Sequence, residues 1–125
     1  MEIRKIRLEK KGAEIVLSPL ESEILNVLWR EKKSRVSRIH AKLRRNIALT
    51  SVAVSLDRLH KKRVVDRAVE AGRGGPHYIY YPIHSRHDFE KSIVDSTVNK
   101  LLNTFGGVAL NYFDERFGKK KGGKK

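Results

Sequence analysis

Apolar residues keep a helical spacing in three short stretches of this chain and then change to strand-like runs, and this order limits the possible folds most. The helical stretches cover residues 19–31, 35–45 and about 50–62. Two runs rich in β-branched and aromatic residues follow, VVDRAVEAG at 64–72 and PHYIYYP at 76–82. Because Arg73, Gly74 and Gly75 separate these runs, they predict a β-hairpin with a glycine-rich connection.

Local signals mark the starts of the helices. In the segment SPLE, Ser18 is expected to be the N-cap, Pro19 the first helical residue and Glu21 the partner of Ser18 in a capping box. The expected caps of the second and third helices are Ser34 and either Thr50 or Ser51. We therefore assign residues 18–84 to one domain of three helices and a hairpin.

The segments outside this domain differ in composition. Residues 1–17 are expected to form an arm or a short hairpin that turns near Gly12. Residues 85–117 are expected to be helical, starting at Ser85 and interrupted by a glycine pair at 106–107. The tail at 118–125, GKKKGGKK, cannot bury a core and is expected to be disordered.

The apolar side chains of residues 85–117 exceed what one small domain can cover. We interpret this segment as a dimerisation element, because a two-fold interface between copies would bury the excess. The residues expected in that interface are Leu101, Leu102, Phe105, Leu110 and Phe113.

Composition excludes several classes of protein. The chain has 125 residues, enough for one domain, and no cysteine, which excludes disulfides, thiolate zinc sites and thiol nucleophiles. It lacks an apolar run of about 18 residues, and residues 1–20 lack the apolar core of a signal peptide. We therefore expect a cytoplasmic protein that does not associate with membranes.

Positive charge is concentrated in the middle of the chain. Of the formal net charge of +14, the stretch from Arg30 to Arg63 holds twelve basic residues against Glu31 and Asp57, a balance of +10. A solvated helical face would explain some of this charge, but an excess of this size favours a polyanionic partner.

Three helices, a hairpin and a further helix form the order of a winged helix-turn-helix, an α+β fold that is mainly helical. In this fold the third helix enters the major groove of double-stranded DNA and the hairpin, or wing, contacts the backbone or the minor groove. Small uncharged side chains suit the base edges, so the expected base-reading residues are Thr50, Ser51 and Val54. The expected backbone contacts are Arg38, Arg58, Lys61, Lys62 and Arg63, and the expected wing contact is Arg73.

The segments LSPLESEILNVLW, ALTSVAVSLDRLHKKRVVDR and HYIYYP, in this order, resemble the penicillinase-repressor family over roughly residues 17–113. The resemblance implies a dimeric repressor that binds operator palindromes and dimerises through its helical C-terminal part. It also implies base-facing positions for Thr50, Ser51 and Val54. Where the family usually has a glycine after a lysine-rich turn, this chain has Arg63.

Two further departures from the family limit what the resemblance implies. Copper-responsive members carry a C-terminal cysteine cluster, which this chain lacks. Members that respond to β-lactams are inactivated by cleavage of an Asn–Phe bond, and the matching bond here is Asn111–Tyr112. We interpret that match as helix packing for dimer contact.

The sequence also contains residues that occur in other kinds of site. His84, His87 and Asp88 could suggest metal ligands, but capping of a helix that starts at Ser85 explains Asp88 equally well. We find no catalytic acid–base pair, phosphate-binding loop or nucleophile elbow, and we expect no enzyme activity, metal or cofactor. The alternatives left open are a sequence-tolerant, chromatin-like nucleic-acid-binding protein and an interaction module within a larger assembly.

Overall fold

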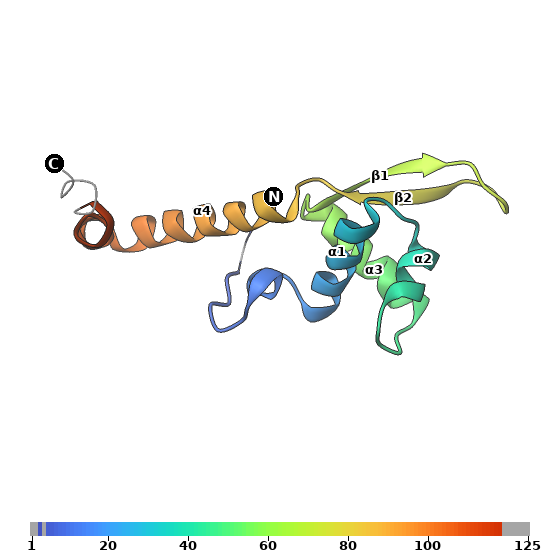
Figure 1. Ribbon diagram of the computed structural model, residues 1–125, viewed down its shortest axis with the longest axis horizontal. Helices are drawn as coiled ribbons and strands as arrows, with labels where there is room; N and C mark the ends of the chain where they lie inside the picture. Colours follow the sequence, from blue (N-terminus) through green and yellow to red (C-terminus); the bar gives the residue numbers. More distant parts are fainter. Residues whose placement is uncertain (1–2, 4, 119–125) are drawn as a thin grey trace. The chain divides into compact units, whose positions relative to one another are not determined.

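The predicted capping box begins the first helix, α1 (Pro19–Glu31), in the computed structural model, which describes Ile3 and residues 5–118 (Figure 1). The backbone N–H of Glu21 donates to Ser18 Oγ at 3.1 Å, and the N–H of Ser18 donates to Glu21 Oε1 at 2.9 Å. Each member of the box satisfies a backbone donor that the first turn leaves unpaired. Pro19, which has no N–H to satisfy, occupies the first helical position.

Two shorter segments complete the helical part of this domain, α2 (Val36–Lys42) and α3 (Leu49–Lys61). The caps predicted for them were wrong, because the N-cap residues are Arg35 and Ala48 and neither makes a side-chain cap. Thr50 and Ser51 lie inside the first turn of α3 with exposed side chains. His40 Nε2 lies 2.6 Å from the carbonyl oxygen of Ile47 and so ties α2 to the turn before α3.

The predicted hairpin is present as β1 (Val65–Glu70) and β2 (His77–Pro82), antiparallel and in register from Val65 opposite Pro82 to Glu70 opposite His77. Ser34 extends this sheet beyond β2, because its N–H and C=O both pair with the backbone of Tyr80, at 2.9 and 2.8 Å. Ser34 is buried in this bridge, which is why it does not cap α2.

The core of the domain lies between the three helices and one face of the hairpin. Residues of α1, α2 and α3 supply most of it, with Val65 and Tyr80 contributed by the strands. The fully buried side chains are Leu17, Ile24, Leu25, Leu28, Ile39, Val52, Leu56, Leu59, Val65 and Phe89. Within α3, burial of Val52, Leu56 and Leu59 leaves the opposite face of the helix in solvent.

The end of α3 forms a Schellman motif, in which Arg63 replaces the usual glycine. The N–H of Val64 donates to the carbonyl of Leu59 and that of Arg63 to the carbonyl of His60, both at 3.0 Å. Arg63 has φ of 62°, a left-handed conformation that is unfavourable for a residue with a Cβ. The departure from the family pattern noted above therefore falls on a strained position.

We expect Arg63→Gly to raise the free energy of unfolding by up to about 1 kcal/mol, since glycine adopts this conformation without steric cost. Chemical denaturation of both proteins measures the difference. Arg63→Ala is the control, because it removes the same charge but keeps the Cβ. A glycine variant no more stable than the alanine variant would contradict the assignment of strain.

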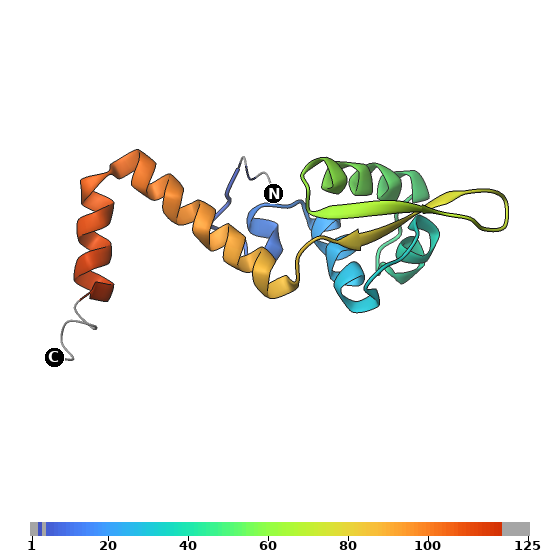
Figure 2. The ribbon, with the colours of Figure 1, turned by 90° about the horizontal axis from the view of Figure 1, so that it is seen from above.

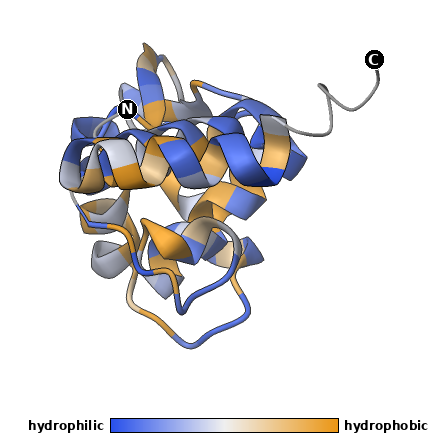
Figure 3. Ribbon diagram, turned by 90° about the vertical axis from the view of Figure 1, so that its left-hand side faces the viewer, coloured by the Kyte–Doolittle hydropathy of each residue, from blue (hydrophilic) through white to orange (hydrophobic). Residues whose placement is uncertain are grey.

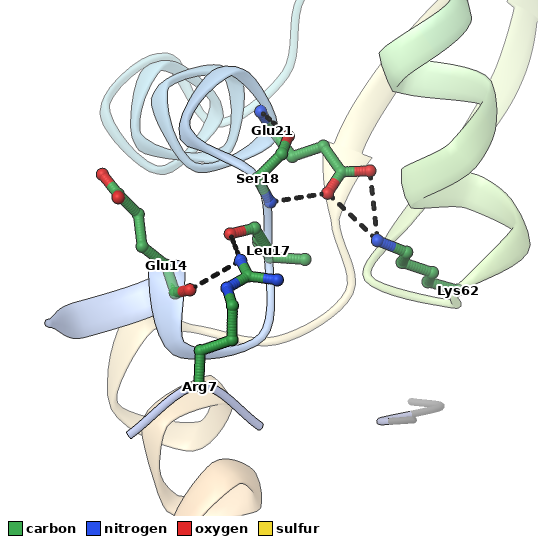
Figure 4. A network of polar contacts seen from close by, with 6 residues as sticks. All are labelled: Arg7, Glu14, Leu17, Ser18, Glu21 and Lys62. Atoms are coloured by element: carbon green, nitrogen blue, oxygen red, sulfur yellow. Dashed lines mark hydrogen bonds and ion pairs between the residues drawn. The ribbon is translucent and has the colours of Figure 1, made fainter. Parts of the chain in front are cut away.

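Of the two forms expected for the N-terminal segment, an arm or a short hairpin, its described residues contain no hairpin. A 3₁₀ turn, η1 (Gly12–Ile15), precedes α1 instead. Arg7 holds this segment in place, because its guanidinium donates to the carbonyl oxygens of Glu14 and Leu17 (Figure 4). Its backbone N–H also donates to the carbonyl of Ile15 at 2.7 Å. Hydrogen bonds from Arg7, and not strand pairing, therefore attach this segment to the residues before α1.

A long helix, α4 (Arg86–Phe105), follows the hairpin (Figure 2). The chain divides into two units within this helix, the first ending at Lys91 and the second beginning at Ser92. The first turn of α4 belongs to the first unit and packs on Trp29. The indole N–H donates to the carbonyl of His84 at 3.0 Å, and the ring of Phe89 meets the indole edge to face, 5.5 Å between centroids. The Arg86 guanidinium lies 4.5 Å from the centre of the Trp29 ring.

The second unit contains the rest of α4, then α5 (Gly107–Phe113) and one π-helical turn (Asp114–Gly118). As predicted, Ser85 accepts a hydrogen bond from the N–H of Asp88, at 3.1 Å, and α4 ends at the glycine pair. Gly106 has φ of 53°, which a glycine tolerates and which turns the chain between α4 and α5. The predicted disordered tail, apart from Gly118, lies outside the described residues.

Candidate nucleic-acid interface

The outward face of α3 carries the three residues predicted to read bases. Thr50, Ser51 and Val54 are all exposed, and half of the surface of Val54 (51%) is open to solvent. Arg58 lies one turn further along the same face and is exposed. The face therefore begins with uncharged side chains small enough for close approach to a base edge and continues with a cation.

The cations predicted to contact the DNA backbone differ in what they already bind. Arg38 donates to Glu31 at 3.2 Å, and Lys61 lies 3.3 Å from Asp57. Lys62 is paired with Glu21, a buried carboxylate. Of the cations predicted to contact DNA, Arg58, Arg63 and Arg73 form no ion pair with another described residue. To bind a phosphate, these three arginines do not have to break an ion pair with any described carboxylate.

Asp57 is the acidic group on the exposed side of α3. A hydrogen bond from Lys61 lowers its pKa, and the nearby Arg67, whose Nη1 lies 3.4 Å from Asp57 Oδ1, acts in the same direction. The carboxylate therefore stays charged at neutral pH and is matched by two cations. Arg67 also stacks on Tyr78 of β2, 4.2 Å from the ring centre, so the base of the wing is fixed to α3.

The tip of the wing presents Arg73 between glycines. Gly74 and Gly75 have φ of 84° and 106°, and the N–H of Gly75 closes the turn by donating to the carbonyl of Gly72 at 3.0 Å. All residues from 71 to 76 are exposed. A narrow loop with a single exposed arginine fits an approach to a DNA groove.

Sequence reasoning did not single out a basic cleft beside the wing. It has a volume of about 230 Å³ and lies between the turn before α2 and β2. Its lining residues are Lys33, Ser34, Arg35, Arg38, Glu70, His77 and Ile79. Lys33 and Arg35 belonged to the basic stretch of the sequence, but the bridge between Ser34 and Tyr80 brings them to the wing, a contact between residues 46 apart.

The described residues offer no cluster of three or more metal-ligating side chains. His87 Nδ1 lies 3.4 Å from Asp88, its sequence neighbour, and both side chains are exposed. Among the described helices, none is long and apolar enough to cross a membrane.

A three-helix core whose third helix exposes small uncharged residues, followed by a two-stranded wing, defines a winged helix-turn-helix protein. A family model described as the penicillinase repressor matches residues 17–121. The chain therefore belongs to the penicillinase-repressor family, whose members are DNA-binding transcriptional regulators. A search of curated proteins gave no match.

Solved structures with a similar fold share little sequence with this chain. A PadR-family transcription regulator from hypervirulent Clostridium difficile is 19% identical, with 70% of this chain and 98% of that chain covered and a TM-score of 0.49. A variant of Lactococcus lactis ZitR in complex with DNA is 18% identical, covering 99% of this chain and 86% of its own, with a TM-score of 0.49.

Proposed function

We propose that this protein is a cytoplasmic homodimeric repressor that binds a palindromic operator in double-stranded DNA. The observation that carries the proposal is the exposed face of α3, where Thr50, Ser51 and Val54 are uncharged and Arg58 follows without an ion pair among the described residues. Thr50 and Ser51 are suited to hydrogen bonds with base edges, and Val54 to contact with a thymine methyl group. Arg58, Arg63 and Arg73 would contact phosphates or the minor groove, and Arg38 and Lys61 would contact phosphates after leaving their surface carboxylates.

The second unit supports the homodimer. From Phe105 onward, its exposed large apolar side chains are Phe105, Val108, Leu110, Tyr112 and Phe117, each at least half open to solvent. Figure 3 shows hydrophobic and hydrophilic stretches alternating along the helix that leads to the grey C-terminal trace. A second copy would cover these side chains, and a two-fold axis would match a palindrome with half-sites about one helical turn apart.

The residues predicted for this interface differ in exposure. Phe105 and Leu110 are exposed, at 58% and 59%, whereas Leu101, Leu102 and Phe113 are partly covered within the single chain. The proposed dimer contact therefore centres on Phe105 and Leu110. Asn111 and Tyr112 lie within the helical turns of α5, which suits their interpretation as part of a packed interface.

Selection of binding sites from random DNA tests the proposal. We expect a two-fold symmetric consensus whose affinity exceeds that of unrelated DNA by about 10³ or more. Affinities within tenfold of each other for all sequences would instead indicate the sequence-tolerant, chromatin-like alternative.

Two variants distinguish residues that read the base sequence from residues that bind the DNA backbone. Val54→Ala is expected to relax the preference at one or two base pairs of each half-site and to leave the salt dependence unchanged, because no charge is removed. Arg58→Ala is expected to weaken binding to every sequence and to reduce the slope of log affinity against log salt by about one per subunit. The reverse pattern would mean that α3 docks in another rotation.

A further inference from the structure

Glu21 is a carboxylate that the fold has removed from solvent. Its side chain is 4% exposed, although it belongs to the first turn of a helix at the surface. One oxygen, Oε1, accepts from the N–H of Ser18 at 2.9 Å. A buried carboxylate requires further compensation, since the capping hydrogen bond alone does not replace its hydration.

Lys62 supplies that compensation from 41 residues away. Its Nζ donates to both carboxylate oxygens of Glu21, at 3.0 and 3.1 Å (Figure 4). The neighbouring Lys61 differs, because its side chain is 75% exposed and its partner Asp57 is itself at the surface. The side chain of Lys62 is 37% exposed, half as much. Two adjacent lysines thus have different environments.

Lys62 lies at the junction between α3 and the hairpin, so its ion pair with Glu21 can fix how these elements are oriented. Lys62 is the C-cap of α3 and directly precedes the left-handed Arg63. The buried Val64 follows, and β1 begins at the next residue. The ion pair therefore connects the start of α1 to the point where the third helix ends and the hairpin begins. The two elements proposed to contact DNA, α3 and the wing, meet at this junction.

We propose that Lys62 is a positioning residue, which orients α3 and the wing through Glu21 and does not neutralise a phosphate. The inference rests on the proposed DNA-binding function and changes the role first expected of Lys62. A lysine held by a buried carboxylate would have to leave that charge uncompensated in order to reach DNA, at a high cost in free energy.

Glu21→Gln gives the sharpest test because the two roles predict opposite signs. Glutamine keeps an acceptor for the N–H of Ser18 and removes the charge that holds Lys62. If Lys62 is a positioning residue, affinity for the selected operator falls by about tenfold while affinity for unrelated DNA stays within about twofold. If Lys62 is a phosphate contact, the freed cation and the extra net charge raise affinity for both DNAs, and the inference fails.

Lys62→Met and Lys61→Met form a matched pair for the salt dependence. Lys62→Met is expected to lower operator affinity with an unchanged salt slope, whereas Lys61→Met is expected to reduce the slope by about 0.9 per subunit, the value for one lost phosphate contact. A fall in slope for Lys62→Met equal to that for Lys61→Met would overturn the inference.

The double variant Glu21→Gln/Lys62→Met controls for folding, because it leaves no unpaired buried charge. It is expected to match wild type in thermal stability more closely than Lys62→Met does, and to keep the reduced operator affinity. Operator affinity restored to the wild-type value would overturn the positioning role. Absence of operator preference in the wild-type protein is a separate outcome, which would reject the proposed function itself.

Discussion

Replacing Leu110 by aspartate is expected to give a monomer that binds the operator on the order of 10²–10⁴ times more weakly than the wild-type protein. Leu110 lies on α5 and is 59% exposed in the single chain, so the substitution removes little packing within the subunit. In the proposed dimer the two aspartates would be buried in an apolar contact, which opposes association. Each monomer would then engage one half-site without the gain from a linked second one.

Sedimentation analysis at micromolar concentration and operator titration measure the two effects. Asn99→Asp is the control, because it places the same charge on an exposed residue of the second unit that is not among the proposed interface residues. It is expected to remain dimeric. A monomeric Leu110→Asp protein that retained full operator affinity would disprove the requirement for a dimer.

Phe89→Ala is expected to lower the free energy of unfolding by about 3–5 kcal/mol. Phe89 is 1% exposed and its ring packs edge to face on Trp29 of α1. Truncation would leave a cavity and remove an aromatic contact in a domain whose total stability is on the order of 5–15 kcal/mol. The first turn of α4 would thereby prove to be part of the DNA-binding domain's core.

Urea unfolding followed by circular dichroism gives the stability difference. Val94→Ala is the control, because Val94 lies on the same helix but is 61% exposed, and its loss is expected to cost less than about 0.5 kcal/mol. Equal effects of the two substitutions would contradict the packing described for Phe89.

The features predicted correctly from sequence are those specified by residues close together in the chain. The capping box of Ser18 and Glu21, the cap at Ser85 and the glycine stop after α4 each depend on a few neighbouring residues, and all three are present. The strands were visible because alternating aromatic and β-branched residues flank a glycine-rich turn.

The predictions that failed depended on contacts that local sequence patterns do not reveal. Ser34 has the composition of a helix cap, but pairing with Tyr80 commits its backbone to the sheet. Residues 1–17 lacked a clear pattern, and Arg7 binds carbonyl groups there in a way that no periodicity reveals. The sequence predicted that Glu21 caps α1 but not that it pairs with Lys62, because the burial of Glu21 follows only from the packing of α1 against α3. Charge alone gave no means of separating Lys62 from Lys61.

The arrangement around Trp29 has an optical consequence. The chain contains one tryptophan, so all indole emission of the protein arises where α1 meets the start of α4. The emission wavelength of an indole depends on its polar surroundings, here the Arg86 guanidinium and the carbonyl of His84. Any event that shifts the first turn of α4 against α1 would change the wavelength of this emission. The protein therefore carries an intrinsic fluorophore at the segment that links its DNA-binding domain to the helices that follow, and no label has to be introduced to observe it.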